Sequence, residues 1–382
     1  MTSLWLDETP ALEAARHPGR IPDVAIVGGG ITGCSAALAL ARAGKRVRVY
    51  EAREIAGGAS GRNGGFALRG MPAPFDVTAE SIGEERAREL WRWTERGLTE
   101  LAALAGTGFR AVGSLRIAAD EEERDELVRE YDGLQAAGLA AEWHDDLPGP
   151  LAGRFAGAVR HPTDGALQPA LVVRRVAALA AGAGVDIRER SRLTAVEDAR
   201  APIVLVATDG YPSGLLGELE GLIVPTRGQI VATEPLAHRW YEVPHYGRHG
   251  FDYWHQTGDG RLVAGGFRDT SLATEFTAEE RVTDAVQRAL EAFVESIAPG
   301  ARIDYRWAGI FGMVMDFLPV VGRVPGRDGM WVAGGYSGHG NVLGFACGQL
   351  AARAILGEEA PFLDLFEPAR LLGEPVGPGA DR

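Results

Sequence analysis

The 382-residue chain has a single lysine, Lys45, so its basic charge comes almost entirely from arginine. It has only two cysteines, Cys34 and Cys347, and both stand in Ala/Leu-rich sequence typical of buried helices, where a thiol is inert. No run of 18 apolar residues is present, which argues against a membrane-spanning helix. The opening residues, MTSLWLDETP, carry acids rather than the basic start of a secretion signal. We therefore expect a cytoplasmic protein without a membrane span.

Acidic residues outnumber basic ones, with 52 Asp and Glu against 39 Lys and Arg, for a net charge of −13. This surplus argues against nucleic acid or an anionic membrane surface as a partner. The eight histidines are scattered without the spacing of metal ligands, so no metal site is predicted. A chain of this length is able to build two domains with sizeable cores.

The stretch 23–51, DVAIVGGGITGCSAALALARAGKRVRVYE, is the most informative part of the sequence. A short apolar run, Val24–Val27, leads into a Gly-x-Gly-x-x-Gly motif at 28–33 and then into an Ala/Leu-rich segment with helical spacing. A second apolar run, Val47–Tyr50, ends at Glu51. This order of strand, glycine turn, helix, strand and acid indicates a dinucleotide-binding βαβ unit.

Each residue type in this unit has a physical role. Gly28 permits a tight turn, Gly30 lets a pyrophosphate approach bare backbone, and Gly33 lets the helix pack closely on the strand. The helix N-terminus supplies free N–H groups for the phosphates. Glu51 is placed to accept hydrogen bonds from ribose hydroxyls and would repel a 2′-phosphate, so FAD or NAD is expected rather than NADP. The alternative is an ordinary glycine turn.

Two further glycine-rich segments favour FAD over NAD. The loop Ala59–Gly65 (ASGRNGG) is too glycine-rich for a helix and too polar for a buried strand, and it suits a long extended ligand. Residues 334–341 (GGYSGHGN) follow the apolar run Met330–Ala333 and precede a helical segment, Leu343–Leu356. The start of that helix is placed to offer N–H donors to an electron-rich carbonyl.

These motifs together resemble the D-amino-acid-oxidase-type superfamily of FAD-dependent oxidoreductases, and within it the γ-glutamylputrescine-oxidase-like group. Other segments agree with the pattern of that family: 3–5, 225–236, 252–254, 260–266, 307–309 and 318–323. The resemblance therefore covers nearly the whole chain, and it implies FAD as the cofactor. We predict that the cofactor-binding residues are Gly28, Gly30, Ile31, Thr32, Gly33, Glu51, Ala52, Ala59, Ser60, Arg62, Asn63, Gly64, Gly65, Leu193, Ala207, Gly335, Gly338, His339, Gly340 and Asn341.

The expected fold is α/β, with a Rossmann-like FAD-binding domain interleaved with a substrate domain on a mostly antiparallel sheet with helices. We assign 1–80, 151–210 and 319–372 to the FAD-binding domain, 81–150 and 211–318 to the substrate domain, and 373–382 to a mobile tail.

Capping patterns mark the starts of two helices in the substrate domain. The first pattern, Asp120-x-x-Glu123, opens a helix that is expected to reach Gly138. The second, Thr277-x-x-Glu280, opens a helix expected to bury Val282, Val286, Leu290, Phe293 and Ile297. A further helix is expected over Ser81–Leu104.

The chemistry is expected to come from the flavin, because no nucleophile or metal constellation is present. The resemblance places His339 close to the flavin. The alternative is that His339 only shapes the glycine-rich turn. Tyr253 and His255 should share one face of a strand and Trp254 the other, as an aromatic wall or as ordinary sheet packing. Arg268 is placed either to bind a substrate carboxylate or to form a surface ion pair with Asp269.

Departures from the family pattern narrow the function. Amino-acid-oxidizing relatives carry a carboxylate-binding arginine in the stretch that corresponds to 308–316, and this stretch has none. It also lacks the cysteine, and 59–66 lacks the histidine, to which relatives attach FAD, so a non-covalent cofactor is predicted. Relatives that react quickly with oxygen can use a lysine above the flavin. The single lysine of this chain, Lys45, lies in the nucleotide-binding unit and cannot serve there, so oxidase and dehydrogenase chemistry both stay open.

The leading hypothesis for the function is FAD-dependent oxidation of a primary or secondary amine, such as a polyamine derivative, to an imine that then hydrolyses. Oxygen or another electron acceptor would complete the reaction. One alternative is oxidation of a cyclic, N-alkyl or D-amino acid by the same fold. A third is a flavin-binding protein without turnover.

Overall fold

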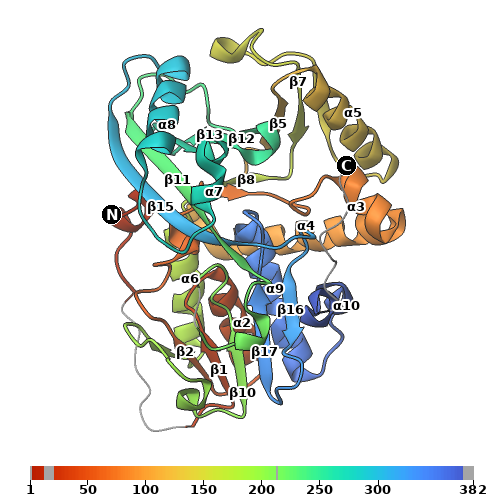
Figure 1. Ribbon diagram of the computed structural model, residues 1–382, viewed down its shortest axis with the longest axis vertical. Helices are drawn as coiled ribbons and strands as arrows, with labels where there is room; N and C mark the ends of the chain where they lie inside the picture. The colour runs from red at the N-terminus through yellow and green to blue at the C-terminus, as the bar shows by residue number, and fades with distance from the viewer. Residues whose placement is uncertain (1, 13–20, 212–213, 373–382) are drawn as a thin grey trace.

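The computed structural model describes residues 2–12, 21–211 and 214–372, and the predicted mobile tail lies outside these ranges. Two large sheets dominate the described part of the chain, a six-stranded sheet in the lower half of Figure 1 and an eight-stranded sheet in the upper half. A small three-stranded sheet joins β3 (Phe66–Ala67), β8 (Gly165–Leu167) and β4 (Phe109–Arg110). The mixed α/β architecture agrees with the predicted fold class.

The six-stranded sheet contains the dinucleotide-binding unit. Its strand order is β16 (Val320–Arg323), β17 (Met330–Gly334), β10 (Ile203–Val206), β1 (Val24–Val27), β2 (Val47–Tyr50) and β9 (Asp186–Arg188). Every neighbouring pair is parallel except β16 with β17. All four residues of β1 and all four of β2 are buried, as expected for strands covered on both faces.

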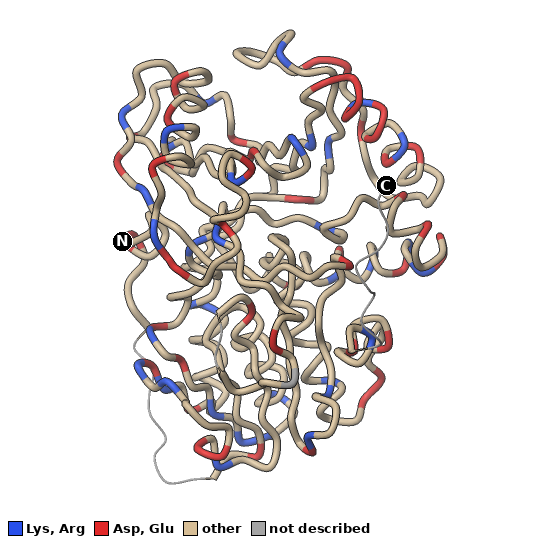
Figure 2. The backbone as a smooth tube through the Cα atoms, in the orientation of Figure 1, with Lys and Arg blue, Asp and Glu red and all other residues tan. Residues whose placement is uncertain are grey.

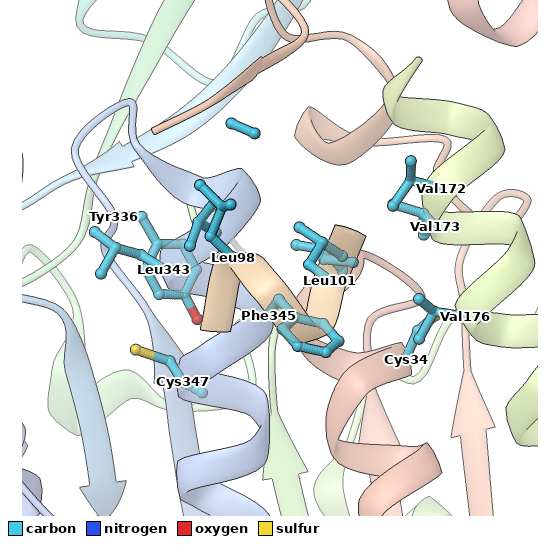
Figure 3. Packing of buried hydrophobic residues seen from close by; sticks show 14 of the residues in the cluster. Cys34, Leu98, Leu101, Val172, Val173, Val176, Tyr336, Leu343, Phe345 and Cys347 are labelled. Atoms are coloured by element: carbon cyan, nitrogen blue, oxygen red, sulfur yellow. The ribbon is translucent and has the colours of Figure 1, made fainter. Parts of the chain in front are cut away.

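Three helices cover one face of this sheet: α2 (Ile31–Arg42), α6 (Pro169–Gly182) and α9 (Gly340–Leu356). The helix α2 packs between the other two. Both cysteines lie in this core on different helices, Cys34 on α2 and Cys347 on α9, and both are buried free thiols, as predicted (Figure 3). The opposite face of the sheet packs on side chains from 193–201 and 215–223.

The eight-stranded sheet is antiparallel except for one parallel pair, β12 with β5. Its order is β15 (Ile303–Met313), β11 (Val224–Pro235), β14 (Arg261–Gly266), β13 (Asp252–Gln256), β12 (His245–Gly247), β5 (Ser114–Ala118), β7 (Gly157–His161) and β6 (Glu142–His144). The helix α8 (Asp284–Ile297) packs on one face, and β11 and β15 extend toward the lower sheet (Figure 1). The remaining α-helices are α1 (Leu4–Asp7), α3 (Phe75–Ile82), α4 (Glu84–Ala105), α5 (Glu121–Ala136), α7 (Leu272–Glu275) and α10 (Leu363–Phe366).

The two predicted capping patterns have different outcomes. Asp120 caps α5 by accepting a hydrogen bond from the N–H of Glu123 at 2.9 Å, as predicted. The Thr277 pattern was wrong as a helix start, because α8 begins at Asp284 with Thr283 in the N-cap position. The Glu280 carboxylate instead accepts hydrogen bonds from Arg53 at 2.9 and 3.0 Å.

Two other expectations differ from the structure in detail. The helix expected over 81–104 is two helices, α3 and α4, separated at Gly83, whose φ of +91° is unfavourable for other residues. Strand β7 falls within the segment 151–210 but pairs in the eight-stranded sheet. The division into a FAD-binding and a substrate domain remains a prediction.

Few charged residues of the described ranges are buried. Charges of both signs follow one another closely along α5 (Figure 2). No helix in the described ranges is both long and apolar enough to cross a membrane. Within the same ranges, no group of three or more His, Cys, Asp or Glu side chains is arranged to bind a metal ion.

Candidate functional site

Three adjoining cavities run from the ends of β1, β2 and β10 in the six-stranded sheet to the eight-stranded sheet. We call them the Glu51 cavity, which is lined by Glu51, Leu193 and Tyr211, the middle cavity, and the His339 cavity, which is lined by His339 and Arg268. Neighbouring cavities share walls: Gly30, Ser60 and Ala207 line the first two, and Asn63, Gly338 and Asn341 the last two. Ala59 lines all three. This arrangement suits one long extended ligand.

The first glycine motif has the tight geometry that its sequence predicted. A side chain at Gly28, whose φ is +114°, would place Cβ 2.4 Å from the carbonyl oxygen of Ala207. A Cβ at Gly33 would lie 2.0 Å from the carbonyl oxygen of Gly28, so only glycine lets α2 approach the turn this closely. At Gly30 the nearest atom to a Cβ would be Oγ of Ser60, at 2.9 Å. Gly33 therefore shapes the turn without lining any of the three cavities.

Glu51 is fixed where the sequence placed it, at the end of β2. Its Oε2 accepts a hydrogen bond from the N–H of Gly29 at 2.7 Å, and its Oε1 accepts one from the N–H of Arg53 at 2.7 Å. Burial raises the pKa of Glu51 above its ordinary value, and these two N–H groups oppose that shift. Each oxygen keeps a second lone pair that is able to accept a ligand hydroxyl.

The second and third glycine segments meet through their asparagines. Nδ2 of Asn63 donates to Oδ1 of Asn341 at 3.1 Å, and Nδ2 of Asn341 donates to Oδ1 of Asn63 at 3.0 Å. Nδ2 of Asn341 also donates to the carbonyl of Phe66 at 2.7 Å. This pairing brings the start of α9 to the loop that follows Glu51.

The strand β13 divides its aromatic residues as the alternation predicted. Tyr253 lines the His339 cavity, and burial raises its pKa to about 12. His255 lies on the same face, behind the loop, with Nε2 2.9 Å from the carbonyl oxygen of Gly64. Trp254 points the other way into the core beside α8 and does not line the cavity.

His339 occupies the N-cap position of α9 and lines the cavity. Its ring meets that of Tyr246 edge-on, with centroids 5.9 Å apart. Burial, and then the charge of Arg116, lower the pKa of His339 to about 4, so its ring is neutral at pH 7. Its Nδ1 is buried and has no hydrogen-bond partner in the described part of the chain. A neutral ring nitrogen without a partner is able to accept a hydrogen bond from a ligand.

Arg268 lines the same cavity. Among the described residues the ion pair of Asp269 is with Arg248, at 2.8 Å, and not with Arg268. Its guanidinium lies 4.3 Å from the centroid of Phe251 and 5.9 Å from that of Phe311. Its hydrogen bond is to the carbonyl of Gly250, at 3.3 Å. Among the described residues no carboxylate forms an ion pair with Arg268, and none lines the His339 cavity. Burial lowers the pKa of Arg268, and the charges of Tyr253, Tyr246 and Asp269 oppose this shift only in part.

Comparison with known proteins decides the family. Residues 23–354 match the family model DAO, described as FAD dependent oxidoreductase. The chain belongs to this family. It is therefore an FAD-dependent oxidoreductase of the DAO family, and FAD is its cofactor.

The similar proteins include enzymes with different substrates in their names. The chain is 30% identical over 370 residues to gamma-glutamylputrescine oxidoreductase from Escherichia coli, covering 89% of this chain and 85% of that protein. It is 28% identical over 385 residues to a probable oxidoreductase OrdL from Haemophilus influenzae, covering 90% and 85%. Among solved structures, glycine oxidase from Geobacillus kaustophilus aligns with a TM-score of 0.74 at 24% identity, covering 91% of this chain and 98% of that one. L-proline dehydrogenase from P. horikoshii has a TM-score of 0.74 at 21% identity, covering 92% and 97%.

The three cavities fit an FAD molecule, because they run from a ribose-type acceptor, Glu51, past a helix N-terminus to a chamber lined by aromatic side chains. Of the predicted cofactor-binding residues, Gly33, Gly65 and Gly335 line none of the cavities, and the rest line at least one. Those assignments remain predictions.

The sequence analysis missed several residues that line the three cavities: Arg53, Phe66, Leu68, Asp209, Tyr211, Tyr246, His249, Phe311, Met313, Phe317 and Tyr336. Phe311 and Met313 lay in the arginine-free stretch that the sequence analysis had singled out, so their position in the wall of the His339 cavity was predictable. Tyr246 and His249 had no local signal, since only pairing of β12 with β13 and β5 brings them to the cavity.

Proposed function

We propose that this enzyme oxidises the CH–NH group of an amine that also carries a carboxylate, giving an imine that hydrolyses in water. The class includes N-alkyl, cyclic and D-amino acids as well as carboxylated polyamine derivatives. The observation that carries the proposal is Arg268, a mostly buried guanidinium that faces the cavity without a carboxylate partner among the described residues. A buried unpaired charge is costly, and a substrate carboxylate would relieve that cost.

The groups around Arg268 suit the same substrate. Tyr246 and Tyr253 line the cavity, interact electrostatically with Arg268, and each has a phenolic O–H that is able to donate to a carboxylate. The stretch where relatives carry an arginine contributes Gly309, Ile310 and Phe311 to the wall instead. Arg268 follows β14, so the positive charge enters the cavity from a different strand.

The reacting amine needs to be unprotonated when it is oxidised. FAD, when bound, takes up the hydride equivalent from the carbon beside nitrogen. His339 is neutral and its Nδ1 has no partner among the described residues, so it is able to accept a hydrogen bond from the substrate amine. A ring with a pKa of about 4 is too weak a base to deprotonate an ammonium, so the amine has to enter unprotonated. The N–H groups at the start of α9 favour negative charge nearby.

A purely cationic polyamine fits this cavity less well. The described residues that line it include Arg268 and Arg62 and no acid, so a second ammonium group would find no counter-charge there. This favours the amino-acid alternative over simple amines. It also accommodates a γ-glutamyl amine, which carries both a carboxylate and an amine, as in the name of the relative at 30% identity.

The test is anaerobic reduction of the bound flavin by matched pairs of amines, scored by bleaching of its visible absorption band. Each pair differs by one carboxylate: sarcosine and dimethylamine, L-proline and pyrrolidine, D-alanine and ethylamine. We expect the carboxylated member to reduce the flavin faster in the pair that fits the cavity. Faster reduction by the decarboxylated members would support simple amine oxidation instead. Bleaching by none of these, nor by γ-glutamylputrescine, would contradict amine oxidation altogether.

A further inference from the structure

The loop Gly61–Gly64 is bound through its carbonyl groups by four side chains from distant parts of the chain. Oγ of Ser3 donates to the carbonyl of Gly61 at 2.6 Å. The indole N–H of Trp307 donates to the carbonyl of Arg62 at 2.9 Å. The indole N–H of Trp5 donates to the carbonyl of Asn63 at 2.8 Å. The fourth carbonyl, of Gly64, faces Nε2 of His255 at 2.9 Å. We call these four donors the carbonyl clamp: Ser3, Trp5, His255 and Trp307.

The ring of His255 has only one tautomer that satisfies its surroundings. The carbonyl of Gly64 only accepts, so Nε2 must carry the hydrogen. Nδ1 faces Nη2 of Arg110 at 3.5 Å, and a guanidinium only donates, so Nδ1 must be the acceptor. Burial, then the charge of Arg110, lower the pKa of His255 to about 3, which keeps this neutral tautomer at pH 7. His255 is therefore a fixed donor to the loop.

The clamp is a connected and fully buried unit. None of its four side chains is more than 1% exposed. The ring of Trp5 stacks on His255 with centroids 6.2 Å apart and meets Trp307 edge-on at 6.4 Å. Because the donors pack on one another, a shift of one is transmitted to the others.

The N–H groups of the same loop are left for a ligand. Within the described ranges, the N–H groups of Asn63 and Gly64 donate to no protein acceptor, although both residues line the His339 cavity. Both residues are half-buried, so an N–H group of theirs that faces the cavity without a protein acceptor is open to an acceptor atom of a ligand. We propose that the carbonyl clamp positions this loop for the flavin, so that these two N–H groups become hydrogen-bond donors to it. The inference does not depend on the substrate.

Indole-to-phenyl substitutions test the proposal, since they remove one donor and keep an aromatic ring. For Trp5→Phe and Trp307→Phe we expect the dissociation constant of FAD to rise about fivefold or more, as for one lost buried hydrogen bond. We also expect a shifted visible absorption band and a more negative flavin midpoint potential, because misaligned donors stabilise the electron-rich reduced flavin less. FAD affinity is measured by titrating the apoprotein, and the potential by reductive titration of the holoprotein.

Trp254→Phe is the matched control. Trp254 precedes His255 on the same strand and is 1% exposed, but its indole N–H has no partner among the described residues. The substitution therefore loses similar packing volume without losing a hydrogen bond. We expect its flavin spectrum, potential and affinity to equal those of the wild type. Urea unfolding of each apoprotein separates general loss of stability from loss of positioning.

The two outcomes are distinct. A spectrum, potential and FAD affinity that change in Trp5→Phe and Trp307→Phe but not in Trp254→Phe support the clamp. Equal flavin properties in all three variants overturn it, whatever the loss of stability. Ser3→Ala, the smallest loss of volume, replaces either clamp variant if that variant does not fold.

Discussion

The phenol of Tyr211 donates a hydrogen bond to Oε2 of Glu280 at 2.7 Å. The same carboxylate accepts from Arg53 at 2.9 Å and lies 3.4 Å from Nε of Arg62. Glu280 stands in the segment between α7 and α8, while its partners line the Glu51 and His339 cavities. Glu280 therefore links the segment between α7 and α8 to residues that line the Glu51 cavity and the His339 cavity.

Replacing Glu280 with glutamine should weaken this connection. Glu280→Gln keeps the shape but leaves two guanidinium groups with less counter-charge, so we expect the free energy of unfolding to fall by about 1–3 kcal/mol. Urea unfolding of the apoprotein measures it. Glu359→Gln is the control, because Glu359 is exposed. Equal stability of the two variants would show that the cluster contributes little.

Arg268 is predicted to set the preference for carboxylated substrates. Arg268→Ala should raise KM for the best carboxylated amine roughly 10- to 100-fold, since a hydrogen bond to a charged group contributes about 1.5–3 kcal/mol. The decarboxylated partner of that amine should be affected far less. Steady-state kinetics on both substrates measure the difference. Arg288→Ala, an exposed position on α8, is the control, and equal losses on both substrates would place the carboxylate elsewhere.

Glu51 is predicted to hold the ribose of FAD. Glu51→Ala removes the acceptor and also frees the N–H groups of Gly29 and Arg53, so FAD affinity should fall roughly 5- to 150-fold. Glu51→Gln should weaken binding less, because its amide oxygen still serves one of the two N–H groups. Fluorescence titration of the apoprotein with FAD measures both, and wild-type affinity in Glu51→Ala would mean that the nucleotide lies elsewhere.

The cofactor is predicted to be non-covalent. The two cysteines are buried in the helical core, and neither lines the described cavities. Acid precipitation should therefore release the yellow flavin into the supernatant. Colour that stays with the pellet, or a flavin-bearing peptide in a tryptic digest, would contradict this.

Stability is predicted to fall in acid through buried histidines. Burial lowers the pKa of His245 to about 4 from an ordinary 6.5, so the unfolded chain binds a proton in this range that the folded one does not. The contribution of the neutral His245 ring to the free energy of unfolding is complete above pH 6.5. It is lost as the pH falls toward 4, and the loss amounts to at most about 3 kcal/mol. Asp164 acts in the opposite direction, because burial raises its pKa to about 6.

Urea unfolding at several pH values between 4 and 7 tests the contribution of His245. His245→Gln should make stability depend less steeply on pH. His238→Gln, at an exposed position, should keep the wild-type slope. An unchanged slope in His245→Gln would show that its ring does not remain neutral in the folded protein.

Much of the fold was predictable because its signals are local. The glycine motif, the apolar strands beside it and Glu51 are contiguous, and each residue type is needed for a turn or a close contact. The cap at Asp120 was local as well. The Thr277 pattern failed because Glu280 binds Arg53, a residue more than 200 positions away, more favourably than it would cap a helix.

The substrate site was less predictable because its side chains are chosen by tertiary contacts. Alternation placed Tyr253 and Trp254 on opposite faces but left open which face meets the cavity. The sequence did not distinguish a substrate-binding Arg268 from an Arg268 that pairs with Asp269. In the structure Asp269 forms its ion pair with Arg248. The position of Tyr246 in the cavity wall depends on the pairing of β12 with β13 and β5, and no local sequence pattern predicts that pairing.

The carbonyl clamp also has a consequence for how the enzyme is made. The loop Gly61–Gly64 leaves the ribosome early, yet Trp307 and Asn341 bind it from far later in the chain. Until those residues have been synthesised, two of the contacts that fix the loop are missing. We therefore expect the loop to reach its final position for flavin binding only after residue 341 has been synthesised.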